Sequence, residues 1–238
     1  MYQIFGLKAL ITAYATIASL VATICLLIQG ADIPFSVWGW PEFLWKPASV
    51  GLTVTGLLFW LLGQTGIFPA LCRHTRFQNI FPDIHGEWTG ALTSNWPIIE
   101  ARGTEHIVNG HLLSRPSTIH IHASLFEVRL TLETNDSYSK STTVLVGVTR
   151  DNVTGSCTFN YIYRNETPNP QPTDEQFHFG AATLTLKRIG NELVLEGPYW
   201  TNRNWKKGLN TAGIATFRKR LAAASDLAPD TDGNLRGH

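Results

Sequence analysis

The stretches ALITAYATIASLVATICLLI (9–28) and SVGLTVTGLLFWLLGQTGIFPAL (49–71) decide the N-terminal fold of this chain. Neither contains a charged side chain. A helix needs about 20 consecutive apolar residues to cross a hydrocarbon core of roughly 30 Å. A run of that length also exceeds the core of a cleavable signal peptide, which has roughly 7–15 apolar residues. We therefore predict a two-helix transmembrane region over residues 1–76, with spans at about 9–29 and 49–71.

The basic residues beside the two spans predict their orientation, because Lys and Arg in short flanks tend to stay on the cytoplasmic side. Lys8, Arg73 and Arg76 flank the outer ends of the pair. The connecting loop has Lys46 beside Asp32 and Glu42. This asymmetry predicts that both termini, and the domain that follows the spans, are cytoplasmic.

The part of the chain after Cys72 is nearly neutral, with 17 Lys and Arg against 16 Asp and Glu. A domain that binds a DNA or RNA polymer needs a strongly basic face, so this balance argues against such a partner. The cysteines Cys25, Cys72 and Cys157 form no even set and no metal-ligand spacing. They predict neither a disulfide framework nor a metal site, which suits a reducing compartment.

After the spans, short runs rich in Thr, Val, Ile, Tyr and Phe alternate with turn residues, which is typical of an antiparallel all-β domain. About eight strands in this length suit a small closed barrel. The segment 96–116 has no strand period and predicts a helix or a loop over one end. The tail 222–238 is small and polar, which predicts disorder. The predicted strands are 85–94, 117–124, 126–134, 138–150, 153–164, 175–187, 192–202 and 209–219.

The alternation of side chains along a strand predicts which residues face the interior of the barrel. The seventh strand is the most informative, because its inward row begins apolar and ends in Tyr199, Thr201 and Arg203. We therefore predict a lumen that is apolar at the bottom and polar at the mouth. Aromatic rings with one arginine suit a nucleotide ligand, but the pattern alone favours rings that simply fill the core. The inward rows are Trp88, Gly90, Leu92 and Ser94; Phe159, Tyr161 and Tyr163; and Leu193, Leu195, Gly197, Tyr199, Thr201 and Arg203.

Several short motifs follow one another behind the two spans. They are IHGEWTGALTSNW (84–96), the serines at 137, 139 and 141, FNYIYRN (159–165), HFG (178–180) and EGPYWTNRNWKKG (196–208). In this order the chain resembles the two-transmembrane, β-strand-rich effectors of cyclic-oligonucleotide antiphage signalling (CBASS) in bacteria. The resemblance covers nearly the whole chain, although no single motif is specific.

The resemblance implies an effector with no catalytic residues, no cofactor and no metal. Residues 77–221 would form a cytosolic, lipocalin-like eight-stranded barrel that binds a cyclic dinucleotide. Binding would promote homo-oligomerisation, and the spans would then disrupt the bacterial inner membrane and cause abortive infection. The alternatives are a membrane-tethered lipocalin-like carrier or sensor of a small hydrophobic ligand, and a hydrolase, for which no histidine lies in a recognisable catalytic motif.

Carried onto this sequence, the resemblance implies ligand contacts from Tyr161, Tyr163, Thr201 and Arg203, and further contacts from Trp88, Ser139, Ser141, His178 and Tyr199. His178 lies out of phase with Phe177 and Phe179, so either it or they must face outward unless a bulge intervenes. In TIHIHAS (118–124), histidines stand near a position where the family pattern predicts glutamine, which leaves a contact from this strand open.

The first span carries a stripe of small or hydroxylated side chains at helical spacing. Such a stripe lets helices approach closely within a membrane. The stripe predicts either packing within the two-helix hairpin or contact between copies of the chain. Its residues are Thr12, Ala15, Thr16, Ser19, Ala22 and Thr23.

Overall fold

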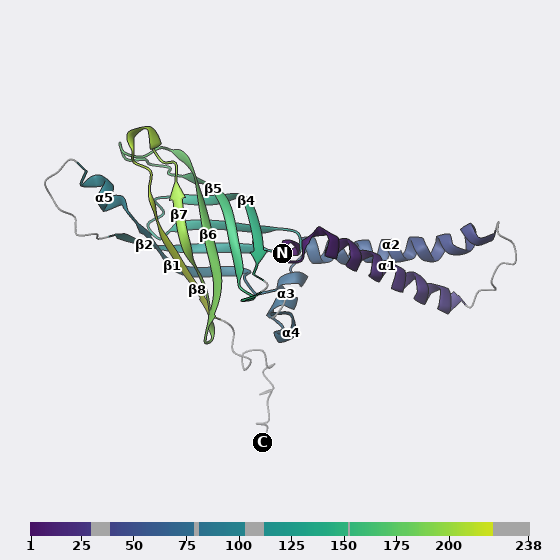
Figure 1. The fold of residues 1–238 in the computed structure, drawn as a ribbon. Helices are drawn as coiled ribbons and strands as arrows, with labels where there is room; N and C mark the ends of the chain where they lie inside the picture. Colours follow the sequence, from purple (N-terminus) through teal and green to yellow (C-terminus); the bar gives the residue numbers. More distant parts are fainter. Residues whose placement is uncertain (30–38, 79–80, 103–111, 152, 221–238) are drawn as a thin grey trace, which may run out of the picture.

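The computed structural model describes residues 1–29, 39–78, 81–102, 112–151 and 153–220. Two long helices form a hairpin that projects from one end of a β-barrel, and two short helices lie beside their junction (Figure 1). The predicted combination of an N-terminal apolar helical pair and an eight-stranded antiparallel barrel is confirmed. The helical elements of this part are η1 (Tyr2–Ile4), α1 (Gly6–Gln29), α2 (Trp40–Gln64), α3 (Ile67–Arg73) and α4 (Thr75–Gln78).

The second long helix is shifted relative to its predicted position at 49–71. It begins at Trp40, includes Lys46 and Pro47, and ends at Gln64. Thr65 ends the helix because its backbone is extended, and its hydroxyl both donates to Leu61 O and accepts from the backbone N–H of residue 67. The uncharged residues that follow belong to the separate helix α3. Lack of charge was therefore a poor guide to where this helix begins and ends.

The two long helices pack through a face that shares only Ala22 with the predicted stripe. Ala18 is buried against Gly51, where an added Cβ would lie 2.4 Å from Ala18 O. The Tyr14 hydroxyl donates to Leu52 O at 3.0 Å. In the stripe, only Ala22 is half-buried, and the other members are exposed: Thr12, Ala15, Thr16, Ser19 and Thr23. Packing within the hairpin is therefore the wrong explanation for most of the stripe.

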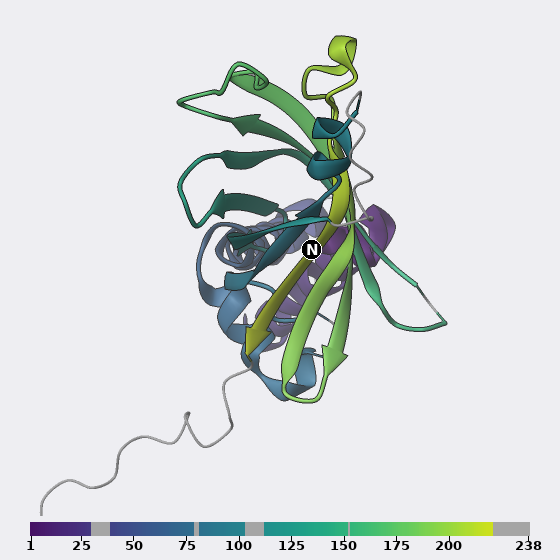
Figure 2. The same ribbon diagram turned by 90° about the vertical axis from the view of Figure 1, so that its left-hand side faces the viewer.

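The barrel is closed, and each strand pairs antiparallel with its neighbours in chain order. Figure 2 views it with the helical hairpin behind. Four connections lie at the mouth of the barrel, and their described residues are 95–102 and 112, 135–139, 167–176 and 202–211. Short turns form its base, and their described residues are 124–127, 151 and 153–156, and 190–191. The strands are β1 (Gly86–Ser94), β2 (Leu113–Ala123), β3 (Val128–Thr134), β4 (Lys140–Arg150), β5 (Cys157–Glu166), β6 (Phe177–Ile189), β7 (Glu192–Thr201) and β8 (Ala212–Arg220).

Two predicted strand starts differ from the observed ones by four residues. The strand predicted at 153–164 begins at Cys157, because the Asp151 carboxylate accepts hydrogen bonds from the backbone N–H groups of Val153 and Thr154 and holds a turn. The strand predicted at 117–124 begins at Leu113, so Pro116 lies inside it. Proline is uncommon within a strand, which hid these residues from the pattern. The short helix α5 (Trp96–Glu100) lies within the segment predicted as a helix or a loop.

The core fills the lower lumen of the barrel, as the period of two predicted. Trp88, Phe159 and Phe217 are at most 1% exposed. His178 faces inward and is half-buried, whereas the side chains of Phe177 and Phe179 are exposed on the outer wall. The pairing of β6 with β5 continues without a shift through these residues, so no bulge is needed. Close packing at this density leaves the lower lumen as a solid core.

The base of the barrel is joined to the helical hairpin. The Leu125 N–H donates to Leu62 O in α2 at 3.2 Å. Phe126 follows in the same turn and lies over Gly63, where an added Cβ would come 2.2 Å from the ring. The Gln3 side chain accepts from the backbone N–H of Val148 in β4 at 2.6 Å. The barrel and the apolar hairpin are thus in direct contact.

Candidate functional site

A hollow of about 450 Å³ opens at the mouth of the barrel, at the end opposite the helical hairpin. Its volume lies within the roughly 300–1,000 Å³ that is usual for sites of small-molecule ligands. Strand ends form its walls, and the β5–β6 loop and α5 form its rim. The residues that line it are Leu92, Ser94, Trp96, Glu100, Leu113, Arg115, Leu132, Thr134, Tyr138, Ser139, Ser141, Tyr163, Asn165, Thr167, Gln171, Pro172, Thr173, Asp174, His178, Tyr199, Thr201, Arg203 and Thr211.

Seven of the nine predicted ligand contacts line this hollow: Tyr163, Thr201, Arg203, Ser139, Ser141, His178 and Tyr199. The other two lie below it. Trp88 is wholly buried, and its indole N–H donates to Ile84 O at 2.8 Å. Tyr161 lies beneath Tyr163, with 5.7 Å between the two ring centroids. Neither belongs to the lining of the hollow, and a direct contact of either with ligand stays a prediction.

The Tyr163 ring lies across the neighbouring strand because that strand has a glycine opposite it. Tyr163 pairs with Gly180, and a Cβ at Gly180 would come 2.3 Å from the Tyr163 ring. Burial raises the pKa of Tyr163 well above its usual value, and the pKa of Tyr199 is also raised by burial. The two phenols therefore stay protonated at neutral pH, so both can donate hydrogen bonds or offer apolar ring faces.

Hydroxyl and amide groups form the polar wall of the hollow. The Ser141 hydroxyl donates to Asn165 Oδ1 at 2.7 Å. The Thr201 hydroxyl lies 3.0 Å from that of Thr211, and it accepts from the backbone N–H of Arg203 at 3.4 Å. Thr201 therefore holds the turn that carries Arg203, in addition to lining the hollow.

The Arg203 side chain is fixed by contacts with an aromatic ring and a carboxylate. Its guanidinium stacks on the Trp96 ring, 4.2 Å from the centroid, and forms an ion pair with Asp174. Only 16% of the side chain is exposed. Its Nε is buried and finds no hydrogen-bond partner among the described residues. A buried donor without a partner is costly, so this atom offers a ligand an unused hydrogen bond.

His178 contributes a second unsatisfied atom, since its Nδ1 is buried without a partner in the described part of the chain. Burial, and next the positive charge of Arg203, lower the pKa of His178 to about 4. The ring is therefore neutral at pH 7. It can donate or accept one hydrogen bond at the mouth without adding charge.

Sequence reasoning missed several residues of this site, including Trp96, Arg115, Tyr138 and Asp174. Trp96 and Asp174 lie in connections rather than in strands, so alternation along a strand says nothing about them. Arg115 lies in the first residues of β2, which precede the predicted start of that strand. The signal that could have found Asp174 is its place in the Pro-rich loop between two strands whose inward rows reach the mouth.

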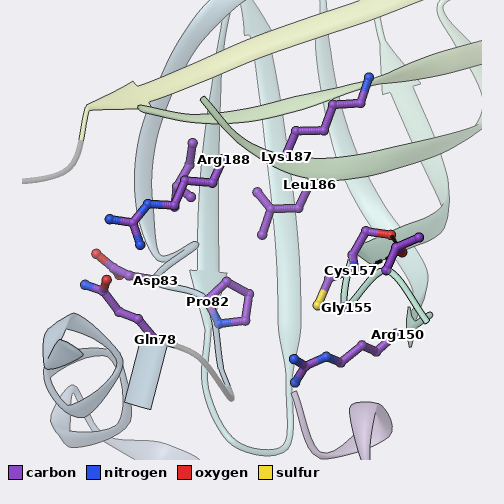
Figure 3. A pocket seen from close by; sticks show the side chains of 12 residues that line it. Gln78, Pro82, Asp83, Arg150, Gly155, Cys157, Leu186, Lys187 and Arg188 are labelled. Atoms are coloured by element: carbon purple, nitrogen blue, oxygen red, sulfur yellow. Dashed lines mark hydrogen bonds between the residues drawn. The ribbon is translucent and has the colours of Figure 1, made fainter. Parts of the chain in front are cut away.

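A second hollow, of about 370 Å³, lies at the base of the barrel beside α4 (Figure 3). Arg150, Arg188 and Gln78 border it, and Leu186 and Cys157 form part of its apolar wall. None of the described residues that line it is aromatic. It can attract an anion but has no ring on which a base could stack, so the mouth is the better nucleotide site.

Comparison with known proteins identifies the family of the barrel that contains the mouth hollow. Residues 79–219 match the family model described as "Cap15, cyclic dinucleotide receptor domain". The chain belongs to this family. It is also 29% identical over 140 residues to "CD-NTase-associated protein 15" of Escherichia albertii, a match that covers 59% of this chain and 63% of that protein. The predicted resemblance to CBASS effectors is therefore confirmed.

The matched residues coincide with the barrel rather than with the helical hairpin. They begin just after α4 and end within β8, so the domain description applies to the part that contains the mouth hollow. Within the described residues, no group of three or more His, Cys, Asp or Glu side chains could hold a metal ion. The family description therefore assigns the barrel as a cyclic dinucleotide receptor domain.

Proposed function

We propose that the mouth of the barrel binds a cyclic dinucleotide and that the helical hairpin converts binding into disruption of the bacterial inner membrane. The observation that carries the proposal is the combination of Tyr163, Tyr199 and Arg203 around one hollow in a domain of the cyclic dinucleotide receptor family. No cofactor and no nucleic-acid polymer enters this scheme.

The hollow supplies what a cyclic dinucleotide requires. Such a ligand carries two bases and two phosphates. Tyr163 and Tyr199 offer ring faces for the bases, because stacking on aromatic side chains suits any base. Arg203 and Arg115 are the Lys or Arg side chains among the described lining residues, and a guanidinium binds phosphate through paired hydrogen bonds. Ser139, Ser141, Thr201 and His178 are the proposed polar contacts.

The helical hairpin supplies the output in this proposal. Both α1 and α2 contain segments long and apolar enough to cross a membrane, at Gly6–Ile28 and Phe43–Gln64. With both termini in the cytoplasm, the barrel faces the compartment in which the second messenger is made. The exposed stripe on α1 is available to a second copy of the chain, and close approach of small residues drives association in lipid. We propose that ligand-induced oligomerisation through this face disrupts the bilayer and causes abortive infection.

The alternative, a carrier or sensor of a small hydrophobic molecule, fits less well. Its ligand would occupy an apolar lumen, but Trp88, Phe159 and Phe217 already fill that space. The lining of the mouth hollow is instead rich in hydroxyl, amide and charged groups.

The test uses the full chain in dye-loaded liposomes. Cyclic di-AMP, cyclic di-GMP and cyclic GMP–AMP are added in turn, with calorimetry for binding and dye release for damage. We expect at least one to bind and to release dye. Arg203→Gln should weaken binding about 10- to 100-fold, because a charge-assisted hydrogen bond contributes about 1.5–3 kcal/mol.

Arg218→Gln is the matched control, since this arginine pairs with Glu192 at 3.1 Å on the exposed side of the barrel. It should bind like the wild type. Absence of binding by every cyclic dinucleotide would contradict the receptor proposal, whereas binding without dye release would contradict the membrane step alone.

A further inference from the structure

The β5–β6 loop, residues 167–176, presses a carboxylate onto the arginine of the mouth. Asp174 forms an ion pair with Arg203, and the Tyr138 hydroxyl donates to the other oxygen of the same carboxylate. Only 6% of the Asp174 side chain is exposed. Burial raises the pKa of Tyr138, and its hydrogen bond to Asp174 raises it further, so the phenol stays protonated and keeps donating. The Asp174 carboxylate therefore takes a hydrogen-bonding position on the Arg203 guanidinium that an anionic ligand would otherwise use.

The residues on either side of Asp174 hold the loop to the same connection that carries Arg203. The Asn204 side chain donates to Thr173 O at 2.6 Å. The backbone N–H of Asn204 donates to Glu175 Oε2 at 3.1 Å. Asn204 adopts a left-handed backbone with φ of 42°, which places both of its donors toward the loop. The loop and the arginine turn are thus fastened together at three successive loop residues.

This arrangement opposes the binding of any anion to Arg203. A guanidinium presents the same planar set of donors to a carboxylate and to a phosphate, so the two compete for one place. A neutral ligand could not take that place, because displacing Asp174 without supplying a negative charge would leave a buried cation unpaired. Trp96 stacks on Arg203 from outside the ion pair and does not depend on which anion is bound.

We propose that Asp174 is a latch that a phosphate of the ligand must displace from Arg203, releasing the loop 167–176 from the mouth. This inference rests on the proposed function and adds to it a regulating contact within the site. The latch selects for anionic ligands, because only an anion compensates the guanidinium. It also lowers affinity, since a ligand that requires a minor, open state binds more weakly by the fraction of that state.

The test compares Asp174→Asn with the wild type, both as full chains in detergent, by calorimetry with cyclic di-AMP, cyclic di-GMP and cyclic GMP–AMP. We expect the variant to bind the active dinucleotide about tenfold more tightly, because the competing charge is gone. Asp174→Ser checks that the gain does not depend on the amide. Glu133→Gln is the matched control, since it removes a carboxylate that pairs with Lys140 and is partly exposed. It should stay within about twofold of the wild type. Equal or weaker binding by both Asp174 variants would overturn the latch.

Hydrogen exchange of the ligand-free proteins separates the latch from the receptor proposal. The Asn204 N–H donates to Glu175 Oε2 in the loop, so this amide reports on the contact between the loop and the arginine turn. We expect faster exchange at this amide in Asp174→Asn, and in the wild type after ligand is added. If no variant binds any dinucleotide, the proposed function fails, and unchanged exchange in Asp174→Asn overturns the latch independently.

Discussion

The two ends of the barrel are built on opposite principles. At the mouth, Arg203 Nε and His178 Nδ1 are buried without partners among the described residues, and the Asp174 carboxylate pairs with the guanidinium. At the base, Phe126 packs over Gly63, and the Leu125 N–H donates to Leu62 O in α2. Among the described residues, the base also has one buried oxygen without a partner, Asp83 Oδ1, but its main contacts join the barrel to the helical hairpin. The mouth is suited to exchange Asp174 for a ligand, and the base is suited to transmit a conformational change to the helical hairpin.

This difference between the two ends predicts that loss of ligand binding and loss of the membrane response can be separated by mutation. A substitution at the mouth should change binding and leave the hairpin attached, because the solid core around Phe159 and Phe217 lies between the two ends. A substitution at the base should leave binding intact and uncouple it from the membrane response. The following variants test that separation.

Gly63→Val has the largest expected effect. An added Cβ at this position would lie 2.2 Å from the Phe126 ring, so the valine must push the barrel turn away from α2. Overpacking of this kind typically costs about 1–3 kcal/mol. We expect dinucleotide-dependent dye release from liposomes to fall about tenfold or more, with calorimetric affinity unchanged within a factor of about three.

The double variant Gly63→Val with Phe126→Ala removes the ring that the valine would strike. It should recover dye release if the clash is the cause. Normal dye release by Gly63→Val alone would refute coupling through this contact, and lost binding would refute the independence of the two ends.

Gly180→Ala has the next largest effect and acts at the mouth. Its Cβ would meet the Tyr163 ring at 2.3 Å and force the ring from its place across β6. We expect calorimetric affinity for the dinucleotide to fall about tenfold, since stacking of one base contributes about 1–3 kcal/mol. Gly147→Ala is the matched control, because the nearest atom to its added Cβ is 3.8 Å away. Unaltered affinity in Gly180→Ala would remove the Tyr163 ring from the ligand site.

The part of the mouth that the sequence predicts is the part built from strand alternation. Tyr163, Tyr199 and Thr201 follow from the period of two, and the structure places all three at the hollow. His178 could not be assigned, because Phe177 and Phe179 beside it are apolar yet exposed, and Arg164 covers the Phe177 ring at 4.3 Å. The cation–π contact with Arg164 stabilises the Phe177 ring at the surface, and no local sequence pattern predicts this contact.

The limits of the helices and the identity of the latch depend on three-dimensional contacts. Residues 67–71 are as uncharged as a span, but Phe68 is buried as part of the core that includes the barrel. Asp174 becomes important only because its loop meets Arg203, some thirty residues later in the chain. Composition predicted a membrane region and a barrel, while the partners of individual side chains required the fold.

The smallest expected effect is a pH dependence of stability from His178. Its pKa is about 4 in the folded protein and near the usual value of 6.5 in an unfolded chain. Between these values the unfolded chain binds more protons, so the free energy of unfolding falls as the pH drops through this window and is fully present above it. Allowing for partial exposure, the loss is on the order of 1–2 kcal/mol.

Urea unfolding followed by tryptophan fluorescence at about pH 7 and pH 4.5 should show this loss in the wild type and a smaller loss in His178→Asn. His120→Asn, on the exposed outer wall, controls for the loss of an imidazole. An equal loss in His178→Asn and the wild type would mean that the neutral ring is not held by burial beside Arg203. His178 would then become protonated at mildly acidic pH and add a positive charge to those of Arg203 and Arg115 at the mouth.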